Sequence, residues 1–253
     1  MIEITPVLGF PEVTAGHVLA ELIAARAELQ DGDVVVVTQK VVSKAEGRLE
    51  AVDPDDPLSH KVIVEREAVR VLRRRGDLLI TETAHGFVCA NAGIDLSNVE
   101  RGWAALLPVD PDRSARRIRD GLRARAGAEV AVIVSDTFGR TWRRGLTDVA
   151  IGCAGVAAVV DLRGTPDTYG REMQVTEVCV ADELAAAAEL VMGKAAGVTD
   201  PPLYAPDRPG DLQRSALDPG RAGIHLGWKP WTKLEDGTAE VIQWFRGSAE
   251  RLA

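Results

Sequence analysis

The sequence has 253 residues, of which 46% are hydrophobic and 27% charged, as is usual for a globular domain. Its net charge of −8 argues against a nucleic-acid partner or an anionic membrane surface, so any bound phosphate must be held by local cations. The N-terminal segment MIEITPVLGFPEV lacks the pattern of a secretion signal, and no apolar run has the length of a membrane span. The three cysteines, Cys89, Cys153 and Cys179, lack CxxC spacing. We therefore expect a cytoplasmic protein with free thiols.

The N-terminal half alternates between helical and strand-like patterns. Residues 16–29 carry apolar side chains at helical spacing, and DGDVVVVTQKVVSK contains a β-branched run that predicts a buried strand. Residues 61–75 (KVIVEREAVRVLRRR) predict an amphipathic helix that ends in arginines. LLITET (78–83) predicts a strand. The stretch HGFVCANAGIDLSNV after it is rich in Gly, Asn and Asp, but it also contains too many apolar residues to be a mere linker.

The C-terminal half continues this alternation. Residues 114–127 predict a basic helix, and residues 128–137 (AEVAVIVSDT) predict an apolar strand that ends in polar side chains. Further strands are expected in 159–164 and 173–183, and an alanine-rich helix in 181–197. Because no simple βαβ repeat is present, we predict an α/β or α+β fold with a mixed sheet.

Two polar clusters follow predicted strands in the first half of the chain. Residues 38–48 combine lysines with hydroxyl groups, which suits a phosphate at a strand end, although Lys44 and Arg48 are equally compatible with an ordinary charged surface. Asp95 is flanked by Ser97 and Asn98, a pattern that fits either a hard-cation ligand or an Asx turn.

A third cluster runs from Ser135 and Asp136, at the end of an apolar strand, to Thr147 and Asp148. A carboxylate there is costly to bury unless a cation pairs with it, and a divalent metal is one solution. Capping of a helix by Asp136 or Thr137 is the alternative. Weaker clusters lie at 169–177 and 192–194, and the common nucleotide and zinc fingerprints are absent.

Four long stretches together resemble one family: VVVVTQKVVSKAEGR, ETAHGFVCANAGIDLSNV, VIVSDTFGRTWRRGLTDVAIGCAG and VADELAAAAELVMGKAAG. They resemble the coenzyme F-420-0:L-glutamate ligases, which are γ-glutamyl ligases of a deazaflavin coenzyme. The resemblance runs in unbroken order from Ile4 to about Val198. It implies a mixed α/β fold of the family's own and an intertwined homodimer.

The resemblance also implies a reaction. Members use GTP and Mn²⁺ or Mg²⁺, and potassium belongs to the same expectation. The terminal carboxylate of coenzyme F-420-0 is expected to be phosphorylated first, after which the amine of L-glutamate attacks the acyl phosphate.

Site residues follow from matching the motifs position by position. Metal contacts are implied for Asp95, Asp136 and Thr137, and catalytic roles for Asp95, Asp136 and Lys44. Some members carry a glutamine metal ligand where this chain has Lys194, and a protonated lysine cannot ligate a cation. GTP contacts are implied for Phe10, Pro11, Glu12, Val13, Gln39, Lys44, Asn98, Met192, Gly193 and Lys194.

The last residues depart from this pattern. We predict a ligase domain at 1–198 and a separate tail at 199–253, which resembles the C-terminal end of nucleotide-sugar epimerases and dehydratases through its RPGD (Arg208 to Asp211) and LGWKP motifs. The chain lacks the glycine-rich loop and the Tyr-x-x-x-Lys pair that an epimerase needs. The sequence therefore predicts a GTP-dependent ligase, and an inactive nucleotide-binding or interaction protein with a replaced C-terminus is the alternative.

Overall fold

A mixed three-stranded sheet forms the centre of the fold. The computed structural model describes residues 2–141 and 143–192, all within one compact unit, Met1–Thr199. Strand β1 (Val34–Thr38) runs parallel to β7 (Ala131–Gly139), which pairs antiparallel with β8 (Leu146–Ala154). The valine-rich runs of β1 and β7 have the β-branched side chains that favour buried strands. The predicted mixed α/β fold is thereby confirmed.

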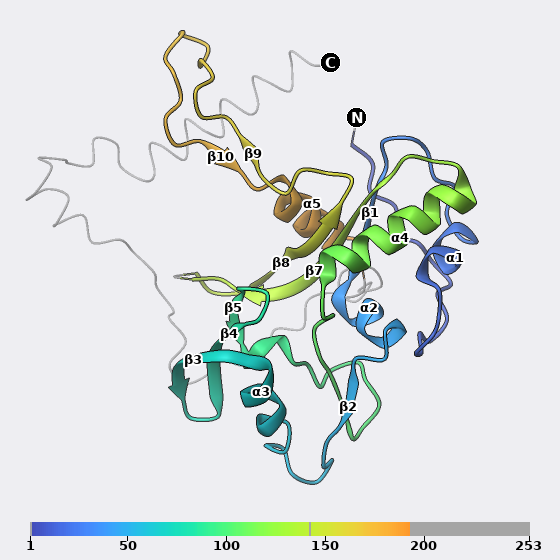
Figure 1. The fold of residues 1–253 in the computed structure, drawn as a ribbon, viewed down its shortest axis with the longest axis vertical. Coiled ribbons are helices and arrows are strands. Elements are labelled where there is room, and N and C mark those ends of the chain that lie inside the picture. The colour runs from blue at the N-terminus through green and yellow to red at the C-terminus, as the bar shows by residue number, and fades with distance from the viewer. Residues whose placement is uncertain (1, 142, 193–253) are drawn as a thin grey trace, which may run out of the picture. The chain divides into compact units, whose positions relative to one another are not determined.

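Helices cover both faces of this sheet (Figure 1). On one face lie α1 (Leu19–Ala24), α2 (Gln39–Ala45) and α4 (Pro111–Ala126). On the other face lies α5 (Val180–Glu189), whose Ala181 and Ala185 pack against Ile133. Because successive strand side chains point to opposite faces, Val132 and Val134 face the first layer and Ile133 faces α5.

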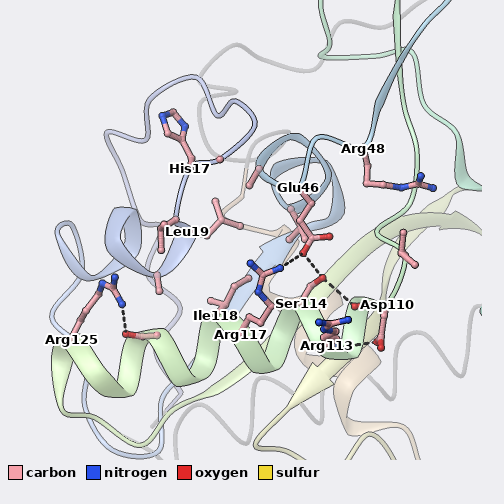
Figure 2. A pocket seen from close by; sticks show the side chains of 17 residues that line it. His17, Leu19, Glu46, Arg48, Asp110, Arg113, Ser114, Arg117, Ile118 and Arg125 are labelled. Carbon is pink, nitrogen blue, oxygen red and sulfur yellow. Dashed lines mark hydrogen bonds and ion pairs between the residues drawn. The ribbon is translucent and has the colours of Figure 1, made fainter.

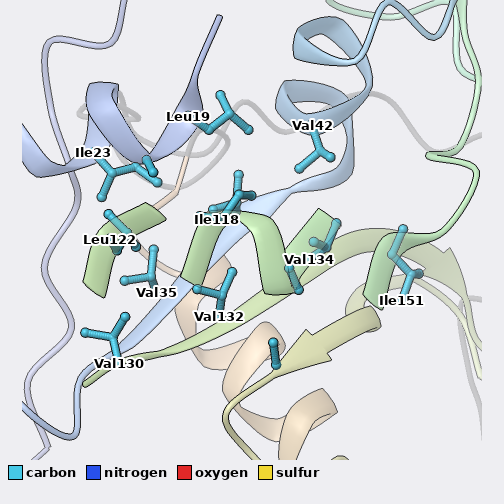
Figure 3. Close-up of a cluster of buried hydrophobic side chains, with 14 of the residues drawn as sticks. Leu19, Ile23, Val35, Val42, Ile118, Leu122, Val130, Val132, Val134 and Ile151 are labelled. Carbon is cyan, nitrogen blue, oxygen red and sulfur yellow. The ribbon is translucent and has the colours of Figure 1, made fainter. Parts of the chain in front are cut away.

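The main core lies between the sheet and the first helical layer. Figure 3 shows aliphatic side chains of α1, α2 and α4 packed over those of the strands. Leu122 and Val132 have no exposed surface. The members labelled in the figure are Leu19, Ile23, Val35, Val42, Ile118, Leu122, Val130, Val132, Val134 and Ile151.

Helix α4 follows the boundaries that its sequence indicates. The Asp110 carboxylate accepts a hydrogen bond from the Arg113 amide at 2.9 Å, Pro111 occupies the first turn, and Gly127 ends the helix at a φ of 71°. Its first turn packs closely on β8, since a Cβ at Gly152 would lie 2.4 Å from the Pro111 carbonyl carbon. The predicted helix at 114–127 is confirmed, one turn longer at its start.

A second, antiparallel sheet contains β3 (Ala68–Arg75), β4 (Leu78–Thr83) and β5 (Val88–Ala90) in that order. The predicted strand at 78–83 is confirmed. The single helix predicted at 61–75 is wrong, because α3 (Lys61–Glu67) ends where β3 begins. The turn between β3 and β4 lets residues 68–75 pair with β4, and that pairing outweighs their helical pattern.

The remaining elements are short. Strand β2 (Leu49–Ala51) pairs with β6 (Trp103–Ala105), and β9 (Val160–Asp161) pairs with β10 (Glu177–Val178). The 3-10 turn η1 spans Asn91–Gly93. The segment between β9 and β10 extends away from the mixed sheet in Figure 1.

Some predicted boundaries differ from the structure. Helix α1 is shorter than the predicted 16–29, and the expected strands at 159–164 and 173–183 are reduced to β9 and β10. Within the described part of the chain, no helix has both the length and the apolar character needed to cross a membrane. The predicted tail at 199–253 lies outside the described residues.

Candidate active site

The carboxyl ends of β1 and β7 meet at one edge of the mixed sheet. Their parallel register pairs Thr38 with Ser135, so α2 begins beside the last residues of β7. Lys40 follows β1 and Asp136 follows Ser135 directly, which brings a cation and a carboxylate to the same sheet edge. Ligands in α/β folds bind at such edges.

A left-handed turn carries Asp95 toward this edge. Asn91, Ala92 and Gly93 have successive φ values of 51°, 54° and 71°. The Ala92 amide donates to the Thr81 hydroxyl at 2.9 Å, which fixes this unusual backbone on β4. Asp95 then forms a two-way backbone bridge with Ala105, so the position of its side chain is set by the surrounding chain.

Lys40, Asp95 and Ser97 form one hydrogen-bonded network. The Lys40 ammonium donates to Asp95 Oδ2 at 2.7 Å and to the Ser97 hydroxyl at 3.0 Å. The Ser97 amide donates to Asp95 Oδ1 at 2.7 Å, and its hydroxyl donates to Oδ2 at 3.0 Å. Burial raises the pKa of Asp95, but these bonds outweigh burial and hold the pKa below its usual value.

Asp136 has the opposite electrostatic surroundings. Burial raises the pKa of its carboxyl to about 7, and the nearby charges of Asp95 and Asp148 raise it as well. A hydrogen bond from the Thr137 amide lowers the pKa, but by less. Burial and the charge of Asp136 raise the pKa of Cys89, on β5, to about 11. Asp95 and Asp136 therefore lie within electrostatic reach, although they are distant in sequence.

Thr137 points away from this pair of carboxylates. Residues 135 and 137 share one face of β7, and Asp136 lies on the other. On their face, the Ser135 hydroxyl donates to Asp148 at 2.9 Å and the Thr137 hydroxyl donates to it at 2.8 Å. The structure thus brings together Asp95 and Asp136 but not the hydroxyl of Thr137.

Some of the predicted GTP contacts lie on α2 or on the loop that is attached to it. Lys44 lies one helical turn after Lys40 and forms an ion pair with Glu12, so the loop 10–13 is attached to α2. Gln39 is only 1% exposed, and its amide donates to Ser43 Oγ at 2.7 Å and to the Leu106 carbonyl at 3.0 Å. In this structure Gln39 supports α2 from inside.

The rest of the predicted nucleotide contacts are spread over the chain. Phe10 packs on the main core and lies 5.6 Å from the Arg26 guanidinium, and Val13 is buried. Asn98 is exposed, with a φ of 52° that an asparagine tolerates well. Met192 follows α5, whereas Gly193 and Lys194 lie outside the described residues.

The donor set suits a small hard cation. Asp95 and Asp136 offer carboxylate oxygens, and a cation between them would offset the burial and repulsion that raise the pKa of Asp136. Within residues 2–141 and 143–192, no group of three or more His, Cys, Asp or Glu side chains is placed to hold a metal ion. Mg²⁺ is commonly held by one or two carboxylates, with water and phosphate oxygens completing its shell, and this pair fits that pattern.

A separate cavity of about 650 Å³ lies between α1, α2 and α4 (Figure 2). Its charges are largely paired, since Glu46 accepts from Ser114 at 2.6 Å and lies 3.9 Å from Arg117. Arg48 pairs with Glu67, also at its rim. Arg48 of the first predicted cluster lines this cavity, but none of the residues predicted to contact GTP or metal does, so the cavity is distinct from the carboxylate pair.

Two residues near the site stand in the predicted clusters, but sequence reasoning gave them no role. Lys40 stood in the first polar cluster without a role, although its spacing of four from Lys44 signals a shared helix face. Asp148 lies on β8, a strand that was not predicted. Asp148 is only 3% exposed and accepts from two hydroxyl groups of β7. Both features result from the pairing of β7 with β8, which the sequence pattern does not indicate.

Comparison with known proteins gives a consistent result. Residues 8–201 match the family described as F420-0:Gamma-glutamyl ligase. A protein from Methanopyrus kandleri, named Coenzyme F420:L-glutamate ligase, is 46% identical over 208 residues, which cover 77% of this chain and 82% of that protein. Proteins of the same name from Methanothermobacter thermautotrophicus and Archaeoglobus fulgidus are each 44% identical, over 213 and 206 residues, and the matches cover 77% and 76% of this chain and 84% and 83% of theirs.

Proposed function

Since the chain belongs to the F420-0:gamma-glutamyl ligase family, we propose that it is an enzyme that joins L-glutamate to coenzyme F-420-0 in F420 biosynthesis. The observation that carries this proposal at the level of the site is the meeting of Asp95, Asp136 and Lys40 at the carboxyl edge of β1 and β7. The relatives' shared name supplies the substrates.

We further propose that GTP drives the reaction through an acyl phosphate. The coenzyme carboxylate attacks the γ-phosphorus, and GDP leaves with the bridging oxygen. The amine of L-glutamate then attacks the acyl carbon, phosphate leaves, and one proton is released as the amide forms. The protein needs no covalent nucleophile for this sequence, and its task is alignment and charge neutralisation.

The roles of the residues follow from their positions. Asp95 and Asp136 would hold Mg²⁺ or Mn²⁺, which neutralises phosphate charge when bound. Lys44 and the loop 10–13 that it holds through Glu12 would contact the nucleotide. Thr137 faces the opposite side of β7 and donates to Asp148, so any metal contact by its hydroxyl would be to a second cation on that face.

The assembly belongs to the same proposal. We expect a homodimer, as the family resemblance implies. Exposed apolar side chains between β9 and β10, where Tyr169 is 95% exposed and Val175 85%, support an interface in that segment. Equilibrium sedimentation of the full chain measures its mass directly, and a monomer at micromolar concentration would contradict the dimer.

The test is a product assay. The full chain is incubated with coenzyme F-420-0, L-glutamate, GTP and Mn²⁺, and the products are analysed by mass spectrometry. We expect species heavier by glutamyl units only when both GTP and the metal are present. Asp136→Asn keeps the shape of the side chain but removes its charge, so the rate should fall by about a hundredfold or more.

Asp55→Asn is the matched control, because Asp55 is an exposed carboxylate that pairs with Arg101 away from the site. It should keep normal turnover. Near-normal turnover by Asp136→Asn would contradict the assignment. GTP binding without any product from well-folded protein would instead support the alternative of an inactive nucleotide-binding protein.

A further inference from the structure

The hydrogen bonds around Asp95 leave it little capacity for a metal ion. A carboxylate has about four acceptor positions, two on each oxygen. Within the described residues, Oδ2 of Asp95 accepts from both Lys40 and Ser97, and Oδ1 accepts from the Ser97 amide. One position on Oδ1 is left, so Asp95 can meet a cation through a single oxygen.

We propose that Lys40 is a specificity-determining residue that makes Asp95 a one-oxygen ligand and so favours Mn²⁺ or Mg²⁺ over Ca²⁺. Mg²⁺ needs near-octahedral geometry with short bonds to single oxygens, whereas Ca²⁺ takes six to eight oxygens and often uses both oxygens of a carboxylate. This inference rests on the proposed function, in which Asp95 holds the divalent cation.

Three observations assign this role to Lys40 in particular. Its ammonium lies 2.7 Å from the oxygen that a second contact to the cation would need. Its side chain is 17% exposed against 44% for Asp95, so the ammonium approaches the carboxylate from the protein side. It also bonds Ser97, the other donor to Oδ2, and therefore holds both blocking groups in place.

The position of Lys40 is itself well fixed. It lies in the first turn of α2, beside Gln39, which is anchored to Ser43 and to the Leu106 carbonyl. This anchoring fixes the backbone of Lys40, and the bonds of its ammonium to Asp95 and Ser97 hold the side chain beside Oδ2.

The test measures metal selectivity without nucleotide or substrate. Mn²⁺ binding to the full chain is followed by loss of the paramagnetic resonance signal of free Mn²⁺, and Ca²⁺ is added as competitor. In Lys40→Met the second oxygen becomes available, so the ratio of the Ca²⁺ to the Mn²⁺ dissociation constant should fall by about tenfold. Ser97→Ala should shift the ratio in the same direction, and Lys40→Arg, which keeps a donor, should restore part of it.

The matched control is Arg116→Met. Arg116 is exposed on α4, away from Asp95, so this variant also removes one positive charge but leaves Oδ2 blocked. Its selectivity ratio should equal that of the unmodified chain. Thermal unfolding of each variant verifies that it is folded.

The outcomes separate the two proposals. An unchanged ratio in Lys40→Met, even if the affinities for both metals change equally, overturns the role of Lys40 while the cation site stands. If the unmodified chain binds no Mn²⁺, the proposed cation site fails and the inference fails with it. A lower ratio in Lys40→Met combined with an unchanged ratio in Arg116→Met supports the inference.

Discussion

At the scale of single residues, side chains of the same type differ in pKa because their neighbours differ. Asp95 has a lysine and a serine as donors, and its pKa is held low, whereas burial raises the pKa of Asp136 to about 7. The same logic applies to the histidines. His60 is buried, and among the described residues its Nδ1 has no hydrogen-bond partner, while His17 is exposed.

His60 should make stability depend on pH. Burial, and then the charge of Lys61, lower its pKa below the ordinary value of about 6.5. The unfolded chain therefore takes up this proton more readily, so the free energy of unfolding is fully present above about pH 6.5 and declines as pH falls toward the lowered pKa. Between pH 7.5 and 5.5 the raised pKa of Asp136, about 7, acts in the opposite direction, so the contribution of His60 is measured as the difference in urea unfolding between the unmodified chain and His60→Leu.

His60→Leu removes the titrating group, so the unmodified chain should lose stability relative to this variant as pH falls from 7.5 to 5.5. A difference between the two chains that stays constant with pH would contradict the role of His60.

At the scale of elements, the turn η1 is the part of the site that tolerates change least. Gly93 has a φ of 71°, and a Cβ there would lie 2.7 Å from Cγ of Leu107, a buried core residue. The turn places Asp95 two residues later. Its geometry therefore links the packing of the main core, which contains Leu107, to the position of a candidate ligand.

Gly93→Ala should lower the free energy of unfolding by about 2–4 kcal/mol, through left-handed backbone strain and the displacement of Leu107. Gly76→Ala is the matched control, because Gly76 has a φ of 56° but nothing within 4 Å of its Cβ position. It should cost about 1–2 kcal/mol, from strain alone. Equal losses in the two variants, measured by chemical denaturation, would contradict the steric role of Leu107.

At the scale of the whole molecule, local patterns predicted the elements whose neighbours agree with them. The apolar runs of β1 and β7 and the capped, amphipathic α4 could be read from the sequence. β8 could not, because Asp148 and Gly152 interrupt its apolar pattern, and residues 68–75 become a strand only by pairing with β4. Asp95 and Asp136 were linked by family resemblance alone, since no local spacing relates them.

The second sheet also affects how whole molecules associate. Within the described residues, β3 has a neighbouring strand on one side only, and seven of its eight residues are exposed, including Val69, Val71 and Leu72. An exposed apolar edge strand can pair with another chain, and charged side chains oppose this. We therefore expect Arg73 and Arg75 to keep the edge soluble.

Replacing both arginines by valine should promote association, because residues 71–73 and 75 are then all apolar, and the remaining charges of Arg70 and Arg74 are paired with Glu82 and Glu65. Light scattering at increasing concentration should show larger particles for Arg73→Val/Arg75→Val. Arg116→Val/Arg123→Val makes the same change of charge and hydrophobicity on the exposed surface of α4, far from any strand edge, and should associate less. If the two double variants associate equally, added hydrophobicity is sufficient to explain the effect, and the strand edge has no special role.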